Sequence, residues 1–268
     1  MKHENPLKPH RAATLAALFL LVAFSLTAAG QSSGENGEKV KLFLEAHAHY
    51  RQADDHFARN DLEGAVTCLE RCLEQFPQHD RAHFLLAKIR LKQRRLTEAE
   101  TQINAAKQSI LELREWYKNI FRPYLDGLRG KKVDNRLRLS ILGESNASAY
   151  CGLRRPITYT ATALRAQDSA IDAILAAFPA QKEAVPAEYN YIHGNVHFLA
   201  GRHDQARVEY ELTLEKNPRH GNASNNLANL YFLHKQYDKA RAYLAQALAC
   251  GARVNPKFQK ALDKAAGR

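Results

Sequence analysis

Cysteine is scarce in this chain, with four among 268 residues: Cys68, Cys72, Cys151 and Cys250. Their spacing matches neither a thiol-redox motif nor a zinc site, so the sequence does not support either chemistry. Cys72 replaces a small core residue, which favours burial over reactivity. Pairing of any two cysteines in a disulfide stays open, because connectivity cannot be derived from one sequence.

Catalytic patterns are missing as well. No Ser/His/Asp order, no phosphate-cradling glycine loop and no paired acidic site stands out in the sequence. We therefore predict that the protein is not an enzyme and uses no cofactor.

Charged residues are absent from Ala12 to Leu26. Basic residues precede this run, and small residues follow it up to Gly30, which is the layout of a secretory signal peptide over 1–30. This predicts export, in the first instance to the periplasm. The alternative is a membrane anchor over 12–30, since this stretch approaches the roughly 20 residues that span a bilayer. No cysteine follows the apolar run, which argues against a lipoprotein anchor.

Acidic residues are outnumbered, with 28 Asp and Glu against 39 Lys and Arg and a net charge of +11. Most of the excess lies between Lys88 and Arg138, where 14 basic residues stand against 6 acidic ones. Such a stretch suits an anionic membrane surface, an acidic partner or nucleic acid. For an exported protein, nucleic acid ranks last.

What the chain does contain is a repeat of 34 residues in each half. In the N-terminal half, Ala53, Ala65 and Cys72 recur as Ala87, Ala99 and Ala106. In the C-terminal half, Gly194, Ala206 and Leu214 recur as Ala228, Ala240 and Leu248. Small residues at fixed points let the two helices of one unit cross closely. This period predicts an all-α helix-turn-helix solenoid whose units stack and leave a long groove.

The repeats divide the chain into six predicted segments. These are a signal peptide or anchor (1–30), a linker (31–45), an N-terminal repeat pair (46–113), a basic insert plus helix (114–186), a C-terminal repeat pair (187–254) and a capping helix (255–268). The turns inside the units are Asn60-Asp61, Arg94-Arg95, Gly201-Arg202 and Lys235-Gln236. Within the insert we expect a helix running to about residue 125, an irregular connector at 127–160 and a helix at 162–178 that packs on the third unit.

These units resemble the tetratricopeptide repeat family in their small residues and in the proline near the end of a unit. Unit three shows Gly194, Ala206 and Pro218, and unit four shows Ala228, Ala240 and Ala247. The family's usual early Trp is absent, and Thr213 stands where unit three should have Ala. The resemblance implies a right-handed superhelix that holds peptides or protein surfaces and has no catalytic chemistry.

Four asparagines recur at i, i+3, i+4 and i+7 in the first helix of unit four. Asn costs about 0.5 kcal/mol against Ala inside a helix, so four on one face require a reason. Their amides both donate and accept, and such a row can pair with the backbone of an extended peptide. The predicted peptide-binding groove comprises Tyr191, Asn195, Asn222, Asn225, Asn226, Asn229 and Lys260. The alternative is that Asn222 caps the helix and the others are solvated.

The family resemblance adds two expectations for this groove. It implies that Asn195, Asn226 and Asn229 hold bound peptides. Members of the family also clamp a partner's C-terminal carboxylate, and here Asn195 and Asn226 match that clamp while Lys260 stands for its Arg. Tyr191 and Pro256 replace the two lysines of the clamp, so it is incomplete.

Two weaker candidates remain. A basic groove in unit two comprises Arg81, Phe84, Lys88 and Lys92. It suits an acidic peptide or a phosphate-bearing head group, unless its lysines snorkel over the helix pair. His193 and His197 have the i, i+4 spacing of two metal ligands, but Gly194 replaces the Glu of a zinc protease motif, so no metal is predicted.

Two functions follow from these observations. The first is a non-catalytic adaptor of the cell envelope that binds a protein or extended peptide in its groove. The alternative is a membrane-tethered protein whose basic region, residues 88–138, binds anionic lipid or an acidic polymer.

Overall fold

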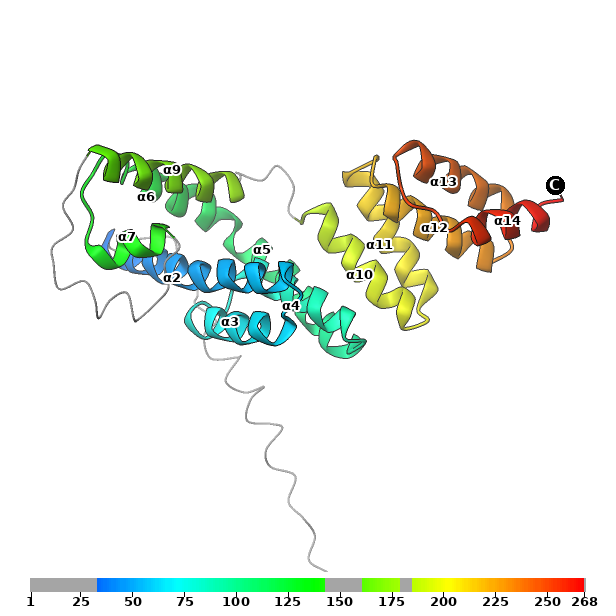
Figure 1. Cartoon of the computed structure of the whole chain (residues 1–268), viewed down its shortest axis with the longest axis horizontal. Helices are drawn as coiled ribbons and strands as arrows, with labels where there is room; N and C mark the ends of the chain where they lie inside the picture. The colour runs from blue at the N-terminus through cyan, green and yellow to red at the C-terminus, as the bar shows by residue number, and fades with distance from the viewer. Residues whose placement is uncertain (1–32, 143–160, 179–184, 268) are drawn as a thin grey trace, which may run out of the picture. The chain divides into compact units, whose positions relative to one another are not determined.

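The computed structural model describes residues 33–142, 161–178 and 185–267, and these residues are helical without any strand (Figure 1). The elements are α2 (Ser33–Ala58), α3 (Leu62–Gln75), α4 (Asp80–Lys92), α5 (Leu96–Trp116), the π-helix η2 (Tyr117–Phe121), α6 (Arg122–Asp126), α7 (Asn135–Leu142), α9 (Ala161–Ala177), α10 (Ala187–Leu199), α11 (His203–Lys216), α12 (Gly221–Leu233), α13 (Tyr237–Ala249) and α14 (Pro256–Ala265). The contacts discussed below lie within the compact unit Gly37–Arg268. The predicted signal segment lies outside the described residues, among which no helix has the length and apolarity to cross a membrane.

The four predicted turns close in the same way. Their first residues have left-handed backbones, with φ of 63° at Asn60, 61° at Arg94, 73° at Gly201 and 58° at Lys235. In each turn, the N–H of the next residue donates to a carbonyl five residues earlier, as from Asp61 to His56 at 2.9 Å and from Gln236 to Tyr231 at 2.8 Å. This hydrogen bond satisfies a carbonyl that the ending helix leaves free. The shared geometry confirms a solenoid of paired helices.

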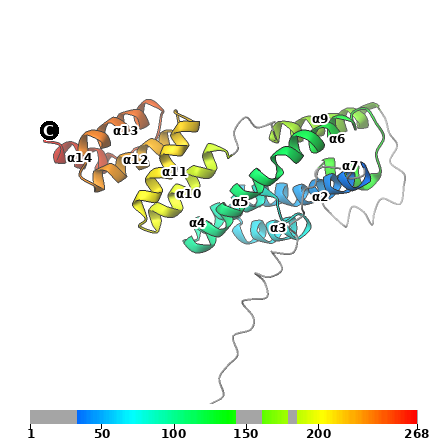
Figure 2. The ribbon, with the colours of Figure 1, turned by 180° about the vertical axis from the view of Figure 1, so that it is seen from behind.

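The two repeat pairs stack directly on each other, although the insert separates them in sequence. Helix α10 contacts both α4 and α5 (Figures 1 and 2). Buried residues of the three helices share one apolar cluster: Ala87, Ile103, Ala106, Ile110, Tyr189 and Ile192. Unit three therefore stacks directly on unit two. The insert, which lies between these units in sequence, is not part of the stack.

The insert packs against the part of α2 that contains Phe43. Helix α5 continues through η2 into α6, which ends at Asp126, close to the predicted end. Helix α9 also lies within one residue of its predicted bounds. The prediction that it packs on unit three is wrong, because Ile171 and Phe178 share a core with Phe43 of α2 and Phe121 of η2. The apolar face of α9 is buried against the aromatic rings of α2 and η2.

Two expected irregular segments contain helix. The linker prediction is wrong over residues 33–45, which belong to α2. Val40, Phe43 and Leu44 share one helical face and are buried there. The connector prediction is wrong over Asn135–Leu142, which forms α7 and buries Leu137 and Ile141 in the same core.

The C-terminal helix and the cysteines complete the fold. Helix α14 begins at Pro256 and buries Leu262 against the apolar cluster of units three and four. Cys68, Cys72 and Cys250 are free thiols, and Cys151 lies outside the described residues. Cys72 is buried as predicted, and burial raises the pKa of its thiol, which makes the thiolate scarce.

Candidate functional site

The structure joins two of the predicted groove asparagines. Asn195 of α10 accepts two hydrogen bonds at Oδ1, from the Tyr210 hydroxyl at 2.8 Å and from Asn226 Nδ2 at 2.9 Å. Asn226 Nδ2 also lies 3.2 Å from the Tyr210 oxygen. Tyr210 is fully buried on α11, and burial raises the pKa of its hydroxyl. This Asn195–Tyr210–Asn226 triad links the first helices of units three and four.

The other asparagines of α12 differ in their surroundings. Asn229 Nδ2 donates to the Asn225 carbonyl at 2.8 Å, and thus bonds to its own helix. Asn225 has a buried Oδ1 that finds no partner among the described residues. Asn222 is exposed and does not cap the helix, because His220 Nδ1 accepts the N–H of Ala223 at 3.1 Å instead.

Tyr191 lies beside this row, whereas Lys260 has no contact with it in the described parts of the chain. The ring of Tyr191 is 4.6 Å from that of His220 and 6.1 Å from that of Tyr210. His220 uses Nδ1 as an acceptor, so its Nε2 carries the proton and donates to Glu188 at 3.2 Å. Lys260 is exposed on α14. We define the amide face as Tyr191, Asn195, Asn225, Asn226 and Asn229.

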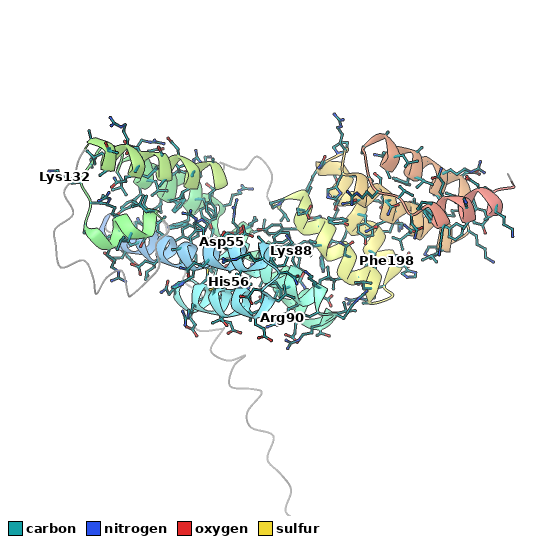
Figure 3. All side chains as sticks on the ribbon, viewed as in Figure 1. Asp55, His56, Lys88, Arg90, Lys132 and Phe198 are labelled. Carbon is teal, nitrogen blue, oxygen red and sulfur yellow. The ribbon has the colours of Figure 1, made fainter. Side chains whose placement is uncertain are left out.

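The cationic side chains of the predicted basic groove contact aromatic rings and a polar side chain of the protein itself. Lys88, marked in Figure 3, holds its Nζ 5.1 Å from the ring of Phe57 and 5.7 Å from that of Phe84. Lys92 Nζ donates to Asn60 Oδ1 at 2.5 Å, and the Arg81 guanidinium lies 4.4 Å from the ring of Phe178. These contacts favour the snorkelling interpretation.

Phe84 belongs to the contact between units two and three. Its ring stacks on that of Tyr189 with centroids 4.2 Å apart. The face that was expected to receive an acidic ligand is thus partly covered by α10.

A buried carboxylate at the start of α4 escaped sequence reasoning. Asp80 is 4% exposed and accepts the hydroxyls of Tyr117 at 3.2 Å and Tyr189 at 3.0 Å. Burial raises the pKa of Asp80 and, together with this carboxylate, those of both tyrosines. These two hydrogen bonds tie η2 and α10 to α4. No spacing in the sequence marks such a set, because its members come from distant segments.

Two buried histidines lie beside this carboxylate. His79 caps α4 through Nδ1, which accepts the N–H of Ala82 at 3.1 Å. Its proton therefore sits on Nε2, which donates to His47 Nδ1 at 3.2 Å. Both rings are neutral in this arrangement. Burial lowers the pKa of His47 to about 3 and that of His79 well below its usual value.

His193 and His197 meet an acidic residue from another unit. One ring nitrogen of each and a carboxylate oxygen of Glu100 on α5 all lie within 4.8 Å of one another. Glu209 Oε1 lies 2.8 Å from His193 Nδ1, and Lys107 Nζ donates to both Glu209 oxygens at 2.8 Å. Burial opposes ionisation of Glu209, but the hydrogen bonds from His193 and Lys107 outweigh it and lower the pKa of this carboxyl. The sequence singled out the two histidines but not Glu100, because nothing in it brings α5 beside α10.

The described residues also line a cavity of about 230 Å³ between units three and four. Its walls include the charged side chains of Asp204, Arg207 and Lys239 and the apolar side chain of Leu230. None of the predicted site residues lines this cavity.

Comparison with known proteins gives one consistent family. Models of the tetratricopeptide repeat match residues 50–110 and residues 197–265. No significant match was found among curated proteins.

Solved structures resemble the chain at low similarity. A pilF structure from Pseudomonas aeruginosa is 15% identical, with 82% of this chain and 83% of that one covered at a TM-score of 0.36. The thermophilic TPR protein TTC0263 of Thermus thermophilus is 20% identical, with 82% and 98% covered at a TM-score of 0.35. The TPR2AB domain of yeast Sti1, in its pHSP90 complex, is 13% identical, with 82% and 96% covered at a TM-score of 0.25. At these scores the superpositions carry no argument about the site.

Proposed function

Because the chain is a tetratricopeptide repeat protein, we propose that it is a non-catalytic adaptor that binds an extended peptide segment of a partner protein on its amide face. Repeats of this family serve in general as scaffolds for protein–protein interaction and not as enzymes. The amide face presents side-chain donors and acceptors, which have the chemistry to recognise a peptide backbone.

The observation that carries this proposal is the single hydrogen bond between Asn195 and Asn226. It uses the Oδ1 of Asn195 and the Nδ2 of Asn226, and it orients both amides. The Nδ2 of Asn195 and the Oδ1 of Asn226 then remain without a partner among the described residues, and neither is a buried atom. A peptide unit offers one N–H and one C=O, which complement one acceptor and one donor held in fixed positions.

The basic region offers less support for the alternative function. Several of its cations are engaged inside the protein: Lys107 with Glu209, Arg122 with the carbonyls of Leu175 and Phe178, Arg129 with Asp172, and Arg136 with Glu45. A charge held by an internal partner attracts an anionic surface less strongly than a free one. We retain the cell envelope as the setting on the strength of residues 1–30, whose pattern is that of an export signal.

The experiment measures peptide affinity for the full chain and two variants. Peptides are selected from a random library on the wild type, and their affinities are measured by fluorescence anisotropy. Asn226→Ala removes one side of the oriented pair and should weaken binding about tenfold, the equivalent of roughly one or two hydrogen bonds. Asn222→Ala is the matched control, because Asn222 is an exposed asparagine of the same helix.

The outcomes separate the two functions. Weakening by Asn226→Ala alone, with an unchanged circular dichroism spectrum, supports the amide face. Equal affinity of both variants and the wild type excludes it. Binding to anionic vesicles that fades as salt screens exposed charges would favour the basic region instead.

A further inference from the structure

The strongest unassigned feature is the cluster of two histidines and a glutamate between units two and three. His193 and His197 face each other on α10, with ring centroids 4.2 Å apart. They are 8% and 6% exposed. Glu100 reaches the cluster from α5, so the set spans two units that the insert separates in sequence.

Two charged groups lie beside Nδ1 of His193: Glu209 Oε1 at 2.8 Å and Lys107 Nζ at 2.9 Å. Lys107 Nζ also donates to both oxygens of Glu209. With its proton on Nδ1, the ring donates to the Glu209 carboxylate, which only accepts. The Nε2 of His193 is then a lone-pair nitrogen, and it is buried without a partner among the described residues.

His197 presents the same anomaly. Its Nδ1 is also buried and finds no hydrogen-bond partner in the described segments. A buried polar atom left unpaired destabilises the folded state, so two in one cluster require a reason. A carboxylate oxygen of Glu100, within 4.8 Å of one nitrogen of each ring, completes a set of donors that zinc-type ions prefer.

We propose that Glu100, His193 and His197 form a binding site for a divalent transition metal ion of the zinc type. Water completes a four-coordinate shell around the ion. Glu209 holds the His193 ring by its Nδ1–H, as carboxylates do behind metal-bound histidines. The site differs from the amide face and does not depend on peptide binding.

The geometry requires only a small closure. Zinc–nitrogen and zinc–oxygen bonds of about 2.0–2.2 Å place tetrahedral ligand atoms roughly 3.4 Å apart. The present separations reach at most 4.8 Å, and rotamer changes of Glu100 can shorten them. Glu100 also accepts from Arg202 at 2.7 Å through Oε2, which leaves Oε1 for the ion.

Occupancy of the site joins the two halves of the solenoid. The ion would link α5 to α10, and with them unit two to unit three. Bound metal stabilises the folded state in proportion to its occupancy, so the melting temperature should rise with free metal concentration.

The test uses Zn²⁺ and Co²⁺ alone as probes of the full chain. Isothermal titration with Zn²⁺ should show one site, and Co²⁺ should develop the visible absorption of a four-coordinate complex. His197→Gln should abolish the site. Glu209→Gln, which loosens His193 without removing a ligand, should weaken Zn²⁺ binding about 10–100-fold. His203→Gln is the matched control, since His203 lies near His234 in a second histidine pair.

Each outcome decides the proposal. Loss of one Zn²⁺ equivalent in His197→Gln but not in His203→Gln supports it. Wild-type protein that binds no Zn²⁺, or binding that survives His197→Gln, overturns it. If His197→Gln unfolds, Glu100→Gln provides the same comparison from a partly exposed position, and its unchanged binding would also overturn the site.

Discussion

Tyr189 of α10 donates its hydroxyl to the buried carboxylate of Asp80 at 3.0 Å, across 109 positions of sequence. The contact joins the first helix of unit three to the first helix of unit two. Asp80 also accepts from Tyr117 of η2. One carboxylate thus ties the C-terminal repeats and the start of the insert to the N-terminal repeats.

Replacing Tyr189 by Phe should therefore destabilise the fold. Tyr189→Phe leaves Asp80 with one hydroxyl fewer in a buried site, at a cost of about 1–3 kcal/mol in the free energy of unfolding. Tyr191→Phe is the control, because the Tyr191 hydroxyl has no hydrogen bond among the described residues. Chemical denaturation of both variants gives the comparison, and equal midpoints would contradict the role of Asp80.

Acid should destabilise the protein through its buried histidines. The pKa of His47 is lowered to about 3 in the folded state, against about 6.5 in the unfolded chain. The unfolded state therefore binds more protons between these two values, so stability rises with pH across that window and falls on acidification below about 6.5. For His47 alone, the loss at pH 5 is about 2 kcal/mol.

Thermal denaturation at pH 7 and pH 5 measures this effect. His79 adds to it in the same direction, because its pKa is also lowered. Asp80 acts in the opposite direction, since its raised pKa favours proton uptake by the folded state. His47→Leu should flatten the slope between the two pH values, and an unchanged slope would show that His47 does not titrate as proposed.

The left-handed turns allow a paired test of backbone strain. Gly201 and Lys235 occupy the same turn position in units three and four, with φ of 73° and 58°. Gly201→Ala should cost about 1 kcal/mol, because a Cβ is disfavoured in this conformation, and no atom lies within 4 Å of that Cβ to add a clash. Lys235→Gly should be neutral or stabilising by up to about 1 kcal/mol. Urea unfolding of both variants checks the opposite signs.

The periodic part of the fold was predictable because it is local. Small residues 34 apart and turn residues between them depend on neighbours within one unit, and all four turns lie where the sequence places them. The path of α9 was not predictable, because its apolar face has no marker that distinguishes the α2 surface from unit three. The partnership of Glu100 with His193 likewise arises only when units two and three stack.

Gly194 should control both the stability of unit three and the shape of the amide face. A Cβ at Gly194 would lie 2.5 Å from Tyr210 Cε1, which is too close for any ring that stays in place. Gly194→Ala must therefore displace Tyr210, whose hydroxyl donates to Asn195. We expect a loss of about 1–3 kcal/mol in stability, together with weaker peptide binding.

A double-mutant cycle separates this clash from other effects of the substitution. Tyr210→Leu removes the ring and its hydroxyl, so adding Gly194→Ala to it should cost much less than the same change in the wild type. The Tyr210 ring occupies the space where a side chain at position 194 would lie. This packing places the Tyr210 hydroxyl within hydrogen-bond distance of Asn195 and Asn226. Additive losses in unfolding free energy would mean that Gly194 acts through its helix backbone instead, because the clash with Tyr210 exists in only one of the two backgrounds.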